Sequence, residues 1–267
     1  MIKLIATDVD GTLVPEGSNA INPEYFSLIR CLKSKGIHFV VASGRHKSSV
    51  DKLFEPVKDD VFLITSNGSY IGTYNKKLSI SNLSPDAYSP ILEDLEYELN
   101  LPYFVETVHA AYTPSKDPDF FKFVKDGYKI DLHPCNSVHE LTDPIIKISA
   151  FHPEHISEVD PSWLNKWNKL CRAVICGKHW VDFLPDNTNK GLALSQLQSL
   201  FGVTINETVA FGDQVNDVEM LKQAYYSFAV EDANPITKNA ARFTCNSCHE
   251  DGVLNTLKQI FIEKKEL

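Results

Sequence analysis

Residues 5–14 read IATDVDGTLV, in which an apolar stretch ends in two carboxylates, Asp8 and Asp10, with Gly11 directly after them. The nearly continuous apolar run Ile2–Ala6 is typical of a strand buried on both faces of a parallel sheet. Two like charges one residue apart repel each other, but they also lie close enough to share one ligand. We therefore expect a cation or a developing charge between them.

The composition limits the class of partner. The chain has 267 residues, a formal net charge of −9 and a pI near 5.5, which disfavours nucleic acid and anionic membranes because both bind clustered Lys and Arg. Small molecules are the favoured partners. No apolar run approaches the roughly 20 residues of a membrane span, and no export signal is evident. We predict a cytoplasmic protein of about two domains, either a monomer or a small homo-oligomer.

The cysteines are scattered through a chain that is long enough to form a core without disulfides, so we expect reduced thiols. The run Cys245-Asn-Ser-Cys248-His249 matches the pattern of covalent haem attachment. Such attachment requires export, so coincidence is the favoured interpretation and a weak metal or redox site is the alternative. The cysteines are Cys31, Cys135, Cys171, Cys176, Cys245 and Cys248.

The first region of the chain alternates strands and helices. Asn22-Pro23-Glu24 is typical of a helix start, and Gly36 is typical of its end. The apolar runs Ile37–Ala42 and Val61–Ile64 are the next strand candidates. Strands that alternate with helices predict a parallel sheet with right-handed crossovers.

The same alternation returns near the end of the chain. Asn189-Lys190-Gly191 opens an amphipathic helix that ends at Gly202, and the short strand Val209–Phe211 follows. The further candidates are a helix around Met220, the strand Tyr226–Val230, and helices that begin at Asn234-Pro235 and after Asp251-Gly252.

The sequence pattern changes between about residues 82 and 186, where prolines cluster and the strand candidates are shorter. This pattern favours antiparallel strands with helices on one face. We predict a doubly wound core, residues 1–82 and 187–267, with a second α/β (α+β) domain, residues 83–186, inserted into it. The chain crosses the boundary twice, and these two crossings would form a hinge. The predicted elements of the insert are the strands Tyr103–Val108, Ile145–Phe151, Ala173–Cys176 and Trp180–Leu184 and the helices Ala87–Leu99 and Ser162–Leu170.

Polar clusters follow the apolar runs or open helices at four places. The carboxyl ends of parallel strands share one edge of the sheet, where ligands bind, so the clusters can converge. Each cluster alone is explained by a turn, a loop, a solvated lysine or a helix cap, and only the four together indicate a site. They are Asp8/Asp10, Ser43-Gly44-Arg45, Asn189-Lys190, and Gly212-Asp213 with Asn216-Asp217.

These residue types suit one chemistry. Carboxylates supply the hard oxygen ligands that Mg²⁺ prefers, and the metal keeps several waters and a substrate phosphate oxygen. Lys190, Ser43 and backbone N–H groups can hold the other phosphate oxygens. The set indicates phosphoryl transfer, in which positioning and charge neutralisation supply most of the catalysis, and it leaves one carboxylate to act as nucleophile.

The motifs resemble those of the haloacid dehalogenase superfamily and, in finer detail, its Cof-type phosphatases. The resemblance implies a Rossmann-like core with an inserted cap domain. Gln214 departs from the pattern, because relatives commonly carry glycine or another small residue there. The matching runs are Asp8-Val9-Asp10-Gly11-Thr12, Ala42-Ser43-Gly44-Arg45, Ser66-Asn67-Gly68, Asn189-Lys190-Gly191, Gly212-Asp213-Gln214-Val215-Asn216-Asp217, Ala233-Asn234-Pro235 and Asp251-Gly252-Val253.

The resemblance also implies residue roles. Asp8 would be the nucleophile and a Mg²⁺ ligand, together with Asp213. Asp10 would protonate the leaving alcohol and then deprotonate water, and its backbone carbonyl would bind the metal. The remaining implied roles are phosphate binding by Ser43, Gly44, Lys190 and Asn216, orientation of Asp10 by Thr12, and action of Asp217 through water or by orienting Lys190.

We predict a Mg²⁺-dependent phosphatase that hydrolyses small phosphomonoesters, such as a sugar phosphate or a flavin-related phosphate, through an aspartyl-phosphate. The alternatives are a phosphotransferase or phosphomutase that uses the same phosphoaspartate, and a non-catalytic regulatory protein that binds a phosphometabolite. Candidates for substrate specificity are Arg45, Asn67 and Asn187. For Asn67 a hairpin turn with Gly68 is the favoured interpretation.

Overall fold

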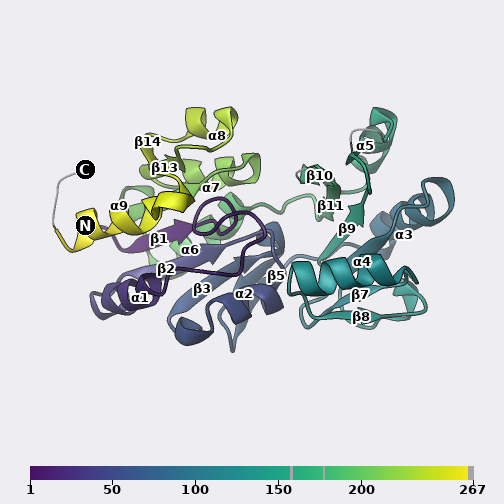
Figure 1. The fold of residues 1–267 in the computed structure, drawn as a ribbon, viewed down its shortest axis with the longest axis horizontal. Coiled ribbons are helices and arrows are strands. Elements are labelled where there is room, and N and C mark those ends of the chain that lie inside the picture. Colours follow the sequence, from purple (N-terminus) through teal and green to yellow (C-terminus); the bar gives the residue numbers. More distant parts are fainter. Residues whose placement is uncertain (157–158, 177, 264–267) are drawn as a thin grey trace. The chain divides into compact units, whose positions relative to one another are not determined.

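The computed structural model describes residues 1–156, 159–176 and 178–263. The chain divides into two compact units (Figure 1). The first unit comprises Met1–Gly44, Val50–Leu78 and Asn189–Leu267, and the second comprises Arg45–Ser49 and Ser79–Thr188. Along the chain, most of the second unit therefore lies between the two halves of the first.

The first unit is built around a mostly parallel sheet. The neighbouring strands from β14 to β3 are parallel, and β4 pairs antiparallel to β3. The interior strand β1 is buried throughout, as its apolar sequence predicts. In sheet order the strands are β14 (Phe243–Cys245), β13 (Tyr226–Val230), β12 (Thr208–Gly212), β1 (Leu4–Thr7), β2 (His38–Ala42), β3 (Val61–Thr65), β4 (Tyr70–Gly72) and β5 (Lys77–Ile80).

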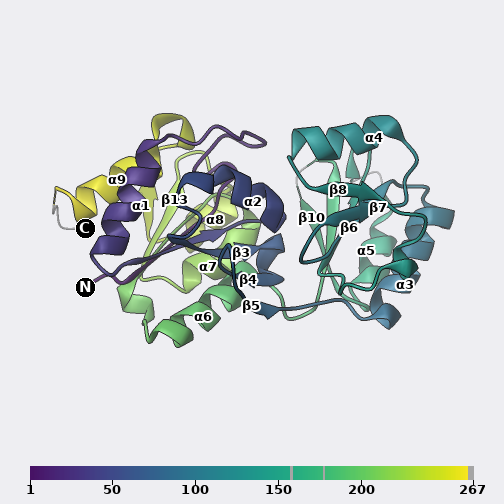
Figure 2. The same ribbon diagram turned by 90° about the horizontal axis from the view of Figure 1, so that it is seen from below.

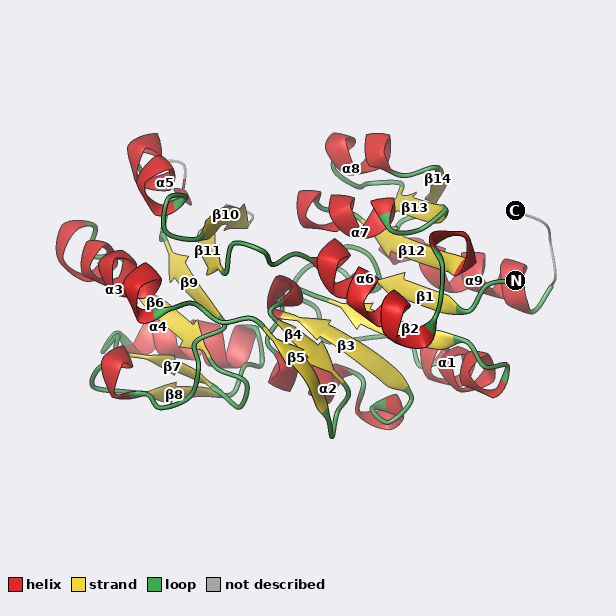
Figure 3. Cartoon of the chain, turned by 180° about the vertical axis from the view of Figure 1, so that it is seen from behind, coloured by secondary structure: helices red, strands yellow, loops and turns green. Residues whose placement is uncertain are grey.

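Helices cover both faces of this sheet. Figure 1 shows α1 and α9 on the near face, and Figure 3 shows α6 and α7 on the opposite one. Leu194 of α6 and Met220 of α7 share a buried cluster with Ala6 of β1. The helices are α1 (Glu24–Ser34), α2 (Lys47–Leu53), α6 (Lys190–Phe201), α7 (Val218–Lys222), α8 (Pro235–Ala240) and α9 (Gly252–Phe261), with the short turns η1 (Glu55–Val57), η2 (Ser66–Gly68), η7 (Ile205–Glu207), η8 (Val215–Asp217) and η9 (Cys248–Glu250).

The helices and strands predicted for this unit occur in the predicted order, whereas α2, β5 and β14 were not predicted. The first strand runs Leu4–Thr7, so it begins two residues later and ends one residue later than predicted. Helix α6 begins where the sequence indicates, because the Asn189 side chain accepts a hydrogen bond from the backbone N–H of Leu192 at 2.8 Å. It ends at Gly202, which adopts the left-handed conformation. The doubly wound α/β fold class is therefore confirmed.

The second unit contains a separate sheet in which most neighbours are antiparallel. Its strands, in sheet order, are β10 (Arg172–Cys176), β11 (Trp180–Leu184), β9 (Lys147–Phe151), β6 (Tyr103–Glu106), β7 (Ala111–Thr113) and β8 (Leu132–Pro134). Its helical segments are α3 (Pro85–Glu93), which continues into the π-helical turn η3 (Asp94–Glu98), α4 (Pro118–Lys122) with η4 (Phe123–Gly127), η5 (Val138–Glu140) and α5 (Pro161–Trp167).

This unit corrects the expectation of antiparallel strands with helices on one face. Strands β7 and β8 are parallel, and α4 lies on the opposite side of the strands from α3 and α5 (Figure 2). Successive residues of β6 explain this, since Tyr103 and Val105 join the cluster of α3 and α5 whereas Phe104 packs with Phe120 of α4. The sequence pattern does not reveal β7, β8 and α4, because segments of three to five residues are too short to show a period.

The six cysteines are all free thiols. Cys245 ends β14 and Cys248 begins η9, so the Cys-x-x-Cys-His run is a strand end followed by a turn. Among the residues that the structure describes, no helix combines the length and apolarity needed to cross a membrane.

We predict that Asp94 is the polar residue on which the core of the second unit depends. Asp94 is 5% exposed, and its Oδ2 accepts a hydrogen bond from Trp167 Nε1 at 2.9 Å while its Oδ1 accepts one from Lys166 Nζ at 2.6 Å. Asp94→Ala leaves the buried indole N–H without an acceptor, which costs about 1–3 kcal/mol of unfolding free energy. Lys166 is half-exposed, so Lys166→Ala costs at most about 1 kcal/mol.

Urea denaturation followed by tryptophan fluorescence measures this difference, because all three tryptophans lie in the second unit. Equal losses in the two variants would contradict the prediction.

Candidate active site

The strand ends that carry the predicted site residues are neighbours in the sheet of the first unit. Strand β1 lies between β2 and β12 and is parallel to both. Asp8 directly follows β1, Ser43 follows β2 and Asp213 follows β12. These residues therefore lie at the edge of the sheet, at the point in the strand order where doubly wound folds bind ligands.

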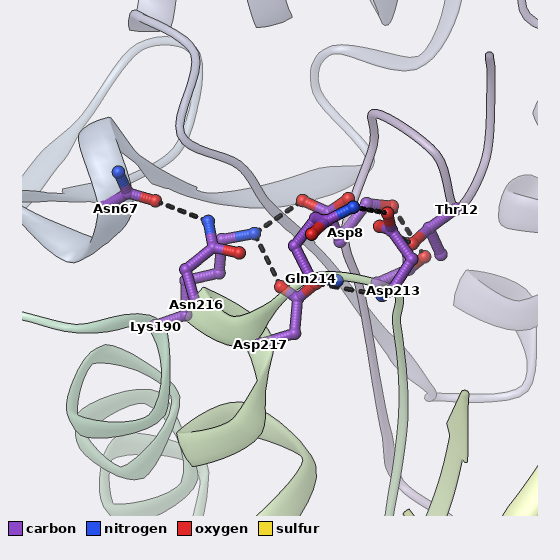
Figure 4. Close-up of polar contacts among 9 residues, drawn as sticks. Asp8, Thr12, Asn67, Lys190, Asp213, Gln214, Asn216 and Asp217 are labelled. Atoms are coloured by element: carbon purple, nitrogen blue, oxygen red, sulfur yellow. Dashed lines mark hydrogen bonds and ion pairs between the residues drawn. The ribbon is translucent and has the colours of Figure 1, made fainter. Parts of the chain in front are cut away.

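Lys190 provides a buried positive charge at this edge (Figure 4). Its Nζ lies 2.5 Å from Asp8 Oδ1 and 2.7 Å from Asp217 Oδ1. Lys190 is 1% exposed and Asp217 is fully buried. Removing one partner of a buried ion pair leaves an uncompensated charge, at a cost of about 3–5 kcal/mol. The three side chains therefore depend on one another to remain charged inside the protein.

The Gly11-Thr12 segment brings the loop after β1 against Asp213. Thr12 Oγ1 donates a hydrogen bond to Asp213 Oδ1 at 2.7 Å. Gly11 has a φ of 79°, and a Cβ atom at this position would lie 2.3 Å from Asp213 Oδ2. Glycine therefore follows the two carboxylates because any side chain would collide with Asp213. Thr12 contacts Asp213 in the structure, and its implied role of orienting Asp10 stays a prediction.

Asp10 lies on the same loop and is partly exposed. Its Oδ1 accepts a hydrogen bond from the backbone N–H of Gly17 at 3.1 Å. Asp10 and Val14 also form a bridge that closes this loop. The carboxyl group of Asp10 is thus held next to the strand end.

Asp217 anchors the loop that follows β12. Its Oδ2 accepts hydrogen bonds from the backbone N–H groups of Asp213 and Gln214, at 3.0 and 3.1 Å. Gln214 Nε2 in turn donates to Asp213 Oδ2 at 3.1 Å. The sequence motif marks Gln214 only as a departure from the family pattern. The structure shows that this longer side chain adds a hydrogen bond to Asp213, which a glycine at that position cannot make.

Burial and mutual repulsion act on the carboxyl groups of the site. Burial raises the pKa of Asp8 well above its usual value; Lys190 opposes this effect, and Asp217 and Asp213 add to it. Burial, followed by the charge of Asp217, raises the pKa of Asp213 to about 6. Burial disfavours the charged form of Lys190, but Asp217 and Asp8 outweigh it and raise the pKa of Lys190. One lysine therefore does not neutralise all the carboxylates around it.

The chemistry of this donor set fits a divalent cation. Asp8, Asp213 and Asp217 each offer a carboxylate oxygen, and these oxygens lie within 4.8 Å of one another. Clustered carboxylate oxygens are the ligands that Mg²⁺ prefers, and a cation would relieve the repulsion between these carboxylates. The implied metal set instead contains Asp10, through its backbone carbonyl, in place of Asp217, and this choice stays a prediction.

A second polar group lies beside the carboxylates. Asn216 Nδ2 donates a hydrogen bond to Asn67 Oδ1 at 2.9 Å (Figure 4). Ser43 is buried, and its backbone N–H continues the pairing of β2 with β3 by donating to Ile64 O at 2.8 Å. The hairpin interpretation of Asn67-Gly68 is confirmed, since η2 joins β3 to β4. The structure thus brings Asn67 to Asn216, which the hairpin signal alone does not reveal.

Two of the predicted specificity residues belong to the second unit. Arg45 is buried, and Asn187 is exposed on the segment between β11 and α6. Their role in specificity stays a prediction.

A parallel sheet with a buried lysine between carboxylates at its switch point is the architecture of an α/β enzyme that acts on phosphate groups. The chain belongs to the haloacid dehalogenase-like hydrolases, whose family model matches residues 5–257. The resemblance of its motifs is therefore confirmed over almost the whole chain.

Relatives of known name and structure agree with this assignment. YbjI of Escherichia coli K12 is named a 5-amino-6-(5-phospho-D-ribitylamino)uracil phosphatase. It is 29% identical to this chain, and the match spans 97% of this chain and 96% of YbjI. YcsE of Bacillus subtilis, which carries the same name, is 26% identical and covers 96% and 95%. A crystal structure from Eubacterium rectale has 37% identity and a TM-score of 0.89, and covers 97% of this chain and 99% of its own. The predicted enzyme class, a phosphatase, is confirmed.

We predict that ionisation of Asp213 destabilises the metal-free protein. The pKa of Asp213 in the folded state, about 6, lies above the value of 3.8 for an unperturbed carboxyl group. The folded state therefore binds this proton more tightly than the unfolded chain does. The resulting stability is fully present below about pH 4 and is lost as the pH rises through about 6.

In EDTA, the melting temperature of wild type should therefore fall between pH 4 and pH 7 relative to that of Asp213→Asn. Thermal denaturation across this range tests the sign. Parallel curves for the two proteins would show that Asp213 does not titrate in this way.

Proposed function

We propose that the protein is a Mg²⁺-dependent phosphatase that hydrolyses small phosphomonoesters through an aspartyl-phosphate on Asp8. The observation that carries this proposal is the buried contact of Lys190 with Asp8 and Asp217 at the carboxyl edge of the sheet. It combines a positive charge for a phosphate group with an oxygen nucleophile that follows the strand directly. The domain assignment, with residues 83–186 as the cap, is part of the same proposal.

In the first half of the reaction, a carboxylate oxygen of Asp8 attacks phosphorus, and the bond from phosphorus to the substrate oxygen breaks. Lys190 reduces the repulsion between Asp8 and the negatively charged phosphate. Asp10, which a hydrogen bond from Gly17 holds on the loop after β1, gives its proton to the departing alcohol.

In the second half, Asp10 removes a proton from water, the water oxygen attacks phosphorus, and the bond to Asp8 breaks to release inorganic phosphate. Ser43, the backbone of Gly44, and Asn216 would hold the phosphate oxygens throughout. When bound to Asp8 and Asp213, Mg²⁺ would supply positive charge that offsets the charge of the phosphate group.

A ribityl phosphate is the first substrate to test. Two relatives that cover at least 95% of both chains carry the name 5-amino-6-(5-phospho-D-ribitylamino)uracil phosphatase. This compound is a phosphomonoester on a sugar alcohol chain, which agrees with the class predicted from the site. Identities of 29% and 26% leave the leaving-group preference to be measured.

We predict that Asp8→Asn abolishes phosphate release, because the amide is not a competent nucleophile. Asp10→Asn should lower the rate by about 10²–10⁴-fold, the usual contribution of a general acid. The assay measures inorganic phosphate from the ribityl phosphate, hexose phosphates and nucleotides. Asp59→Asn is the matched control, since Asp59 is an exposed acid of the same unit.

Turnover by Asp8→Asn at a rate near that of wild type would exclude the covalent mechanism. Transfer of the phosphoryl group to an added sugar, without release, would favour a phosphotransferase. No reaction with any compound would favour a binding protein.

We predict that Mg²⁺ stabilises the protein through the carboxylates at the sheet edge. A free Mg²⁺ concentration of 100 times its Kd should stabilise the folded state by about 2.7 kcal/mol. Differential scanning calorimetry with and without Mg²⁺ measures the shift in melting temperature. Asp59→Asn should keep the full shift and Asp213→Asn should lose most of it. The absence of any shift in wild type would contradict a metal site here.

A further inference from the structure

The turn η2 contacts three loops of the proposed phosphate site, all within the first unit. The backbone N–H of Asn67 donates to Ser43 O at 3.1 Å. The Asn67 side chain accepts from Asn216, and a Cβ atom on Gly68 would lie 2.6 Å from the backbone oxygen of Asn189. One short turn therefore contacts the loop after β2, the loop after β12 and the start of α6.

The backbone of this turn is held in an unfavourable conformation. Ser66, Asn67 and Gly68 have φ values of 50°, 56° and 103°, which place three successive residues in the left-handed region. Such conformations persist for residues other than glycine only where the surrounding structure enforces them, and they are common at functional sites. Asn67 is also 4% exposed, whereas the asparagine of an ordinary hairpin turn is solvated. The turn is thus buried, strained and contacted on several sides.

The amide of Asn67 lies between two groups that we assign to phosphate binding. A Cβ atom on Gly44 would lie 3.1 Å from Asn67 Oδ1 and 3.3 Å from Nδ2, so the amide rests against the Gly44 backbone. On its other side, Asn67 Oδ1 accepts one hydrogen of the Asn216 amide at 2.9 Å (Figure 4). An amide NH₂ group has two hydrogens, so this contact leaves the second for a phosphate oxygen.

The contact with Asn67 sets the orientation of the Asn216 side chain. Asn216 Oδ1 is buried and has no hydrogen-bond partner among the residues that the structure describes. No hydrogen bond to Oδ1 therefore fixes the orientation of the Asn216 amide. Its hydrogen bond to Asn67 selects which way the NH₂ group points, and hence whether it can donate toward the site.

We propose that Asn67 is a positioning residue for the phosphate group, which acts by orienting Asn216 and by supporting the Ser43-Gly44 turn. This inference rests on the proposed function, and it replaces the predicted role of Asn67 in substrate specificity. A residue that acts on the phosphate changes the reaction of every phosphomonoester by the same factor. A specificity residue changes the ratio between substrates with different leaving groups.

The test uses Asn67→Gly, because glycine tolerates the left-handed backbone and removes only the side chain. The readouts are the Kd of inorganic phosphate by calorimetry in the presence of Mg²⁺, and kcat/KM for a ribityl phosphate and a hexose phosphate. We expect Asn67→Gly to weaken phosphate binding about tenfold, which corresponds to about 1.4 kcal/mol, and to lower both kcat/KM values by equal factors. The melting temperature reports whether the variant remains folded.

A double-mutant cycle tests whether Asn67 affects phosphate binding through Asn216. If Asn67 acts partly through Asn216, the loss of phosphate binding in Asn67→Gly/Asn216→Ala is smaller than the sum of the losses in the two single variants. Additive losses overturn the action through Asn216. A phosphate Kd in Asn67→Gly within about twofold of wild type, or a changed ratio between the two substrates, overturns the positioning role.

If Asn67→Gly unfolds, Asn67→Asp tests the same idea, because aspartate also tolerates the left-handed conformation and keeps an oxygen acceptor for Asn216. Its added negative charge must weaken phosphate binding if the turn borders the phosphate, so an unchanged Kd overturns the inference. The proposed function fails separately, by the absence of phosphate release from wild type. Normal release by wild type together with an unaltered Asn67→Gly removes only this inference.

Discussion

The rest of the site depends on the ammonium group of Lys190, which is buried between Asp8 and Asp217. A buried charge is costly unless it is paired and hydrogen-bonded, and the ammonium of Lys190 and the carboxylates of Asp8 and Asp217 pair with each other. This mutual requirement connects the end of β1, the start of α6 and the loop after β12, which are far apart in sequence. Asp217 also accepts hydrogen bonds from the backbone N–H groups of the loop that carries Asp213, so this loop joins the same group of contacts. The two ion pairs of Lys190 thus connect Asp8, Asp217 and the loop that carries Asp213.

The carboxylates exceed the positive charge that the chain itself provides. Burial and repulsion raise the pKa values of Asp8 and Asp213, so the site is better suited to a cation and a phosphate group than to remaining without them. Hydrogen bonds from Thr12 and Gln214 hold both oxygens of the Asp213 carboxyl group. The protein's own side chains thus fix the position of this carboxylate, and fixed positions of charged groups favour electrostatic catalysis.

The glycines near the site show how close packing constrains the sequence. The Asp213 side chain lies close to Gly11, and the backbone of Asn189 lies close to Gly68. Neither position has space for a Cβ atom. These approaches connect the loop after β1 to the loop after β12, and the turn after β3 to the start of α6. The motif glycines are thus required by contacts between loops, and not by the local turn alone.

The sequence by itself determined the order of most strands and helices in the core, since apolar runs, the Asn189 cap and the Gly202 end are local signals that each segment carries alone. It also identified Asp8, Lys190, Asp213 and Asp217 as candidates, because their positions after strands or at helix starts place them at one edge of a parallel sheet. Only the tertiary structure decided which groups meet: Thr12 supports Asp213, Gln214 reaches the same carboxylate, Asn67 meets Asn216, and α4 packs on the second face of its sheet. These contacts join residues whose local sequence is compatible with several partners. The choice among those partners depends on distances that are set only when the whole unit packs.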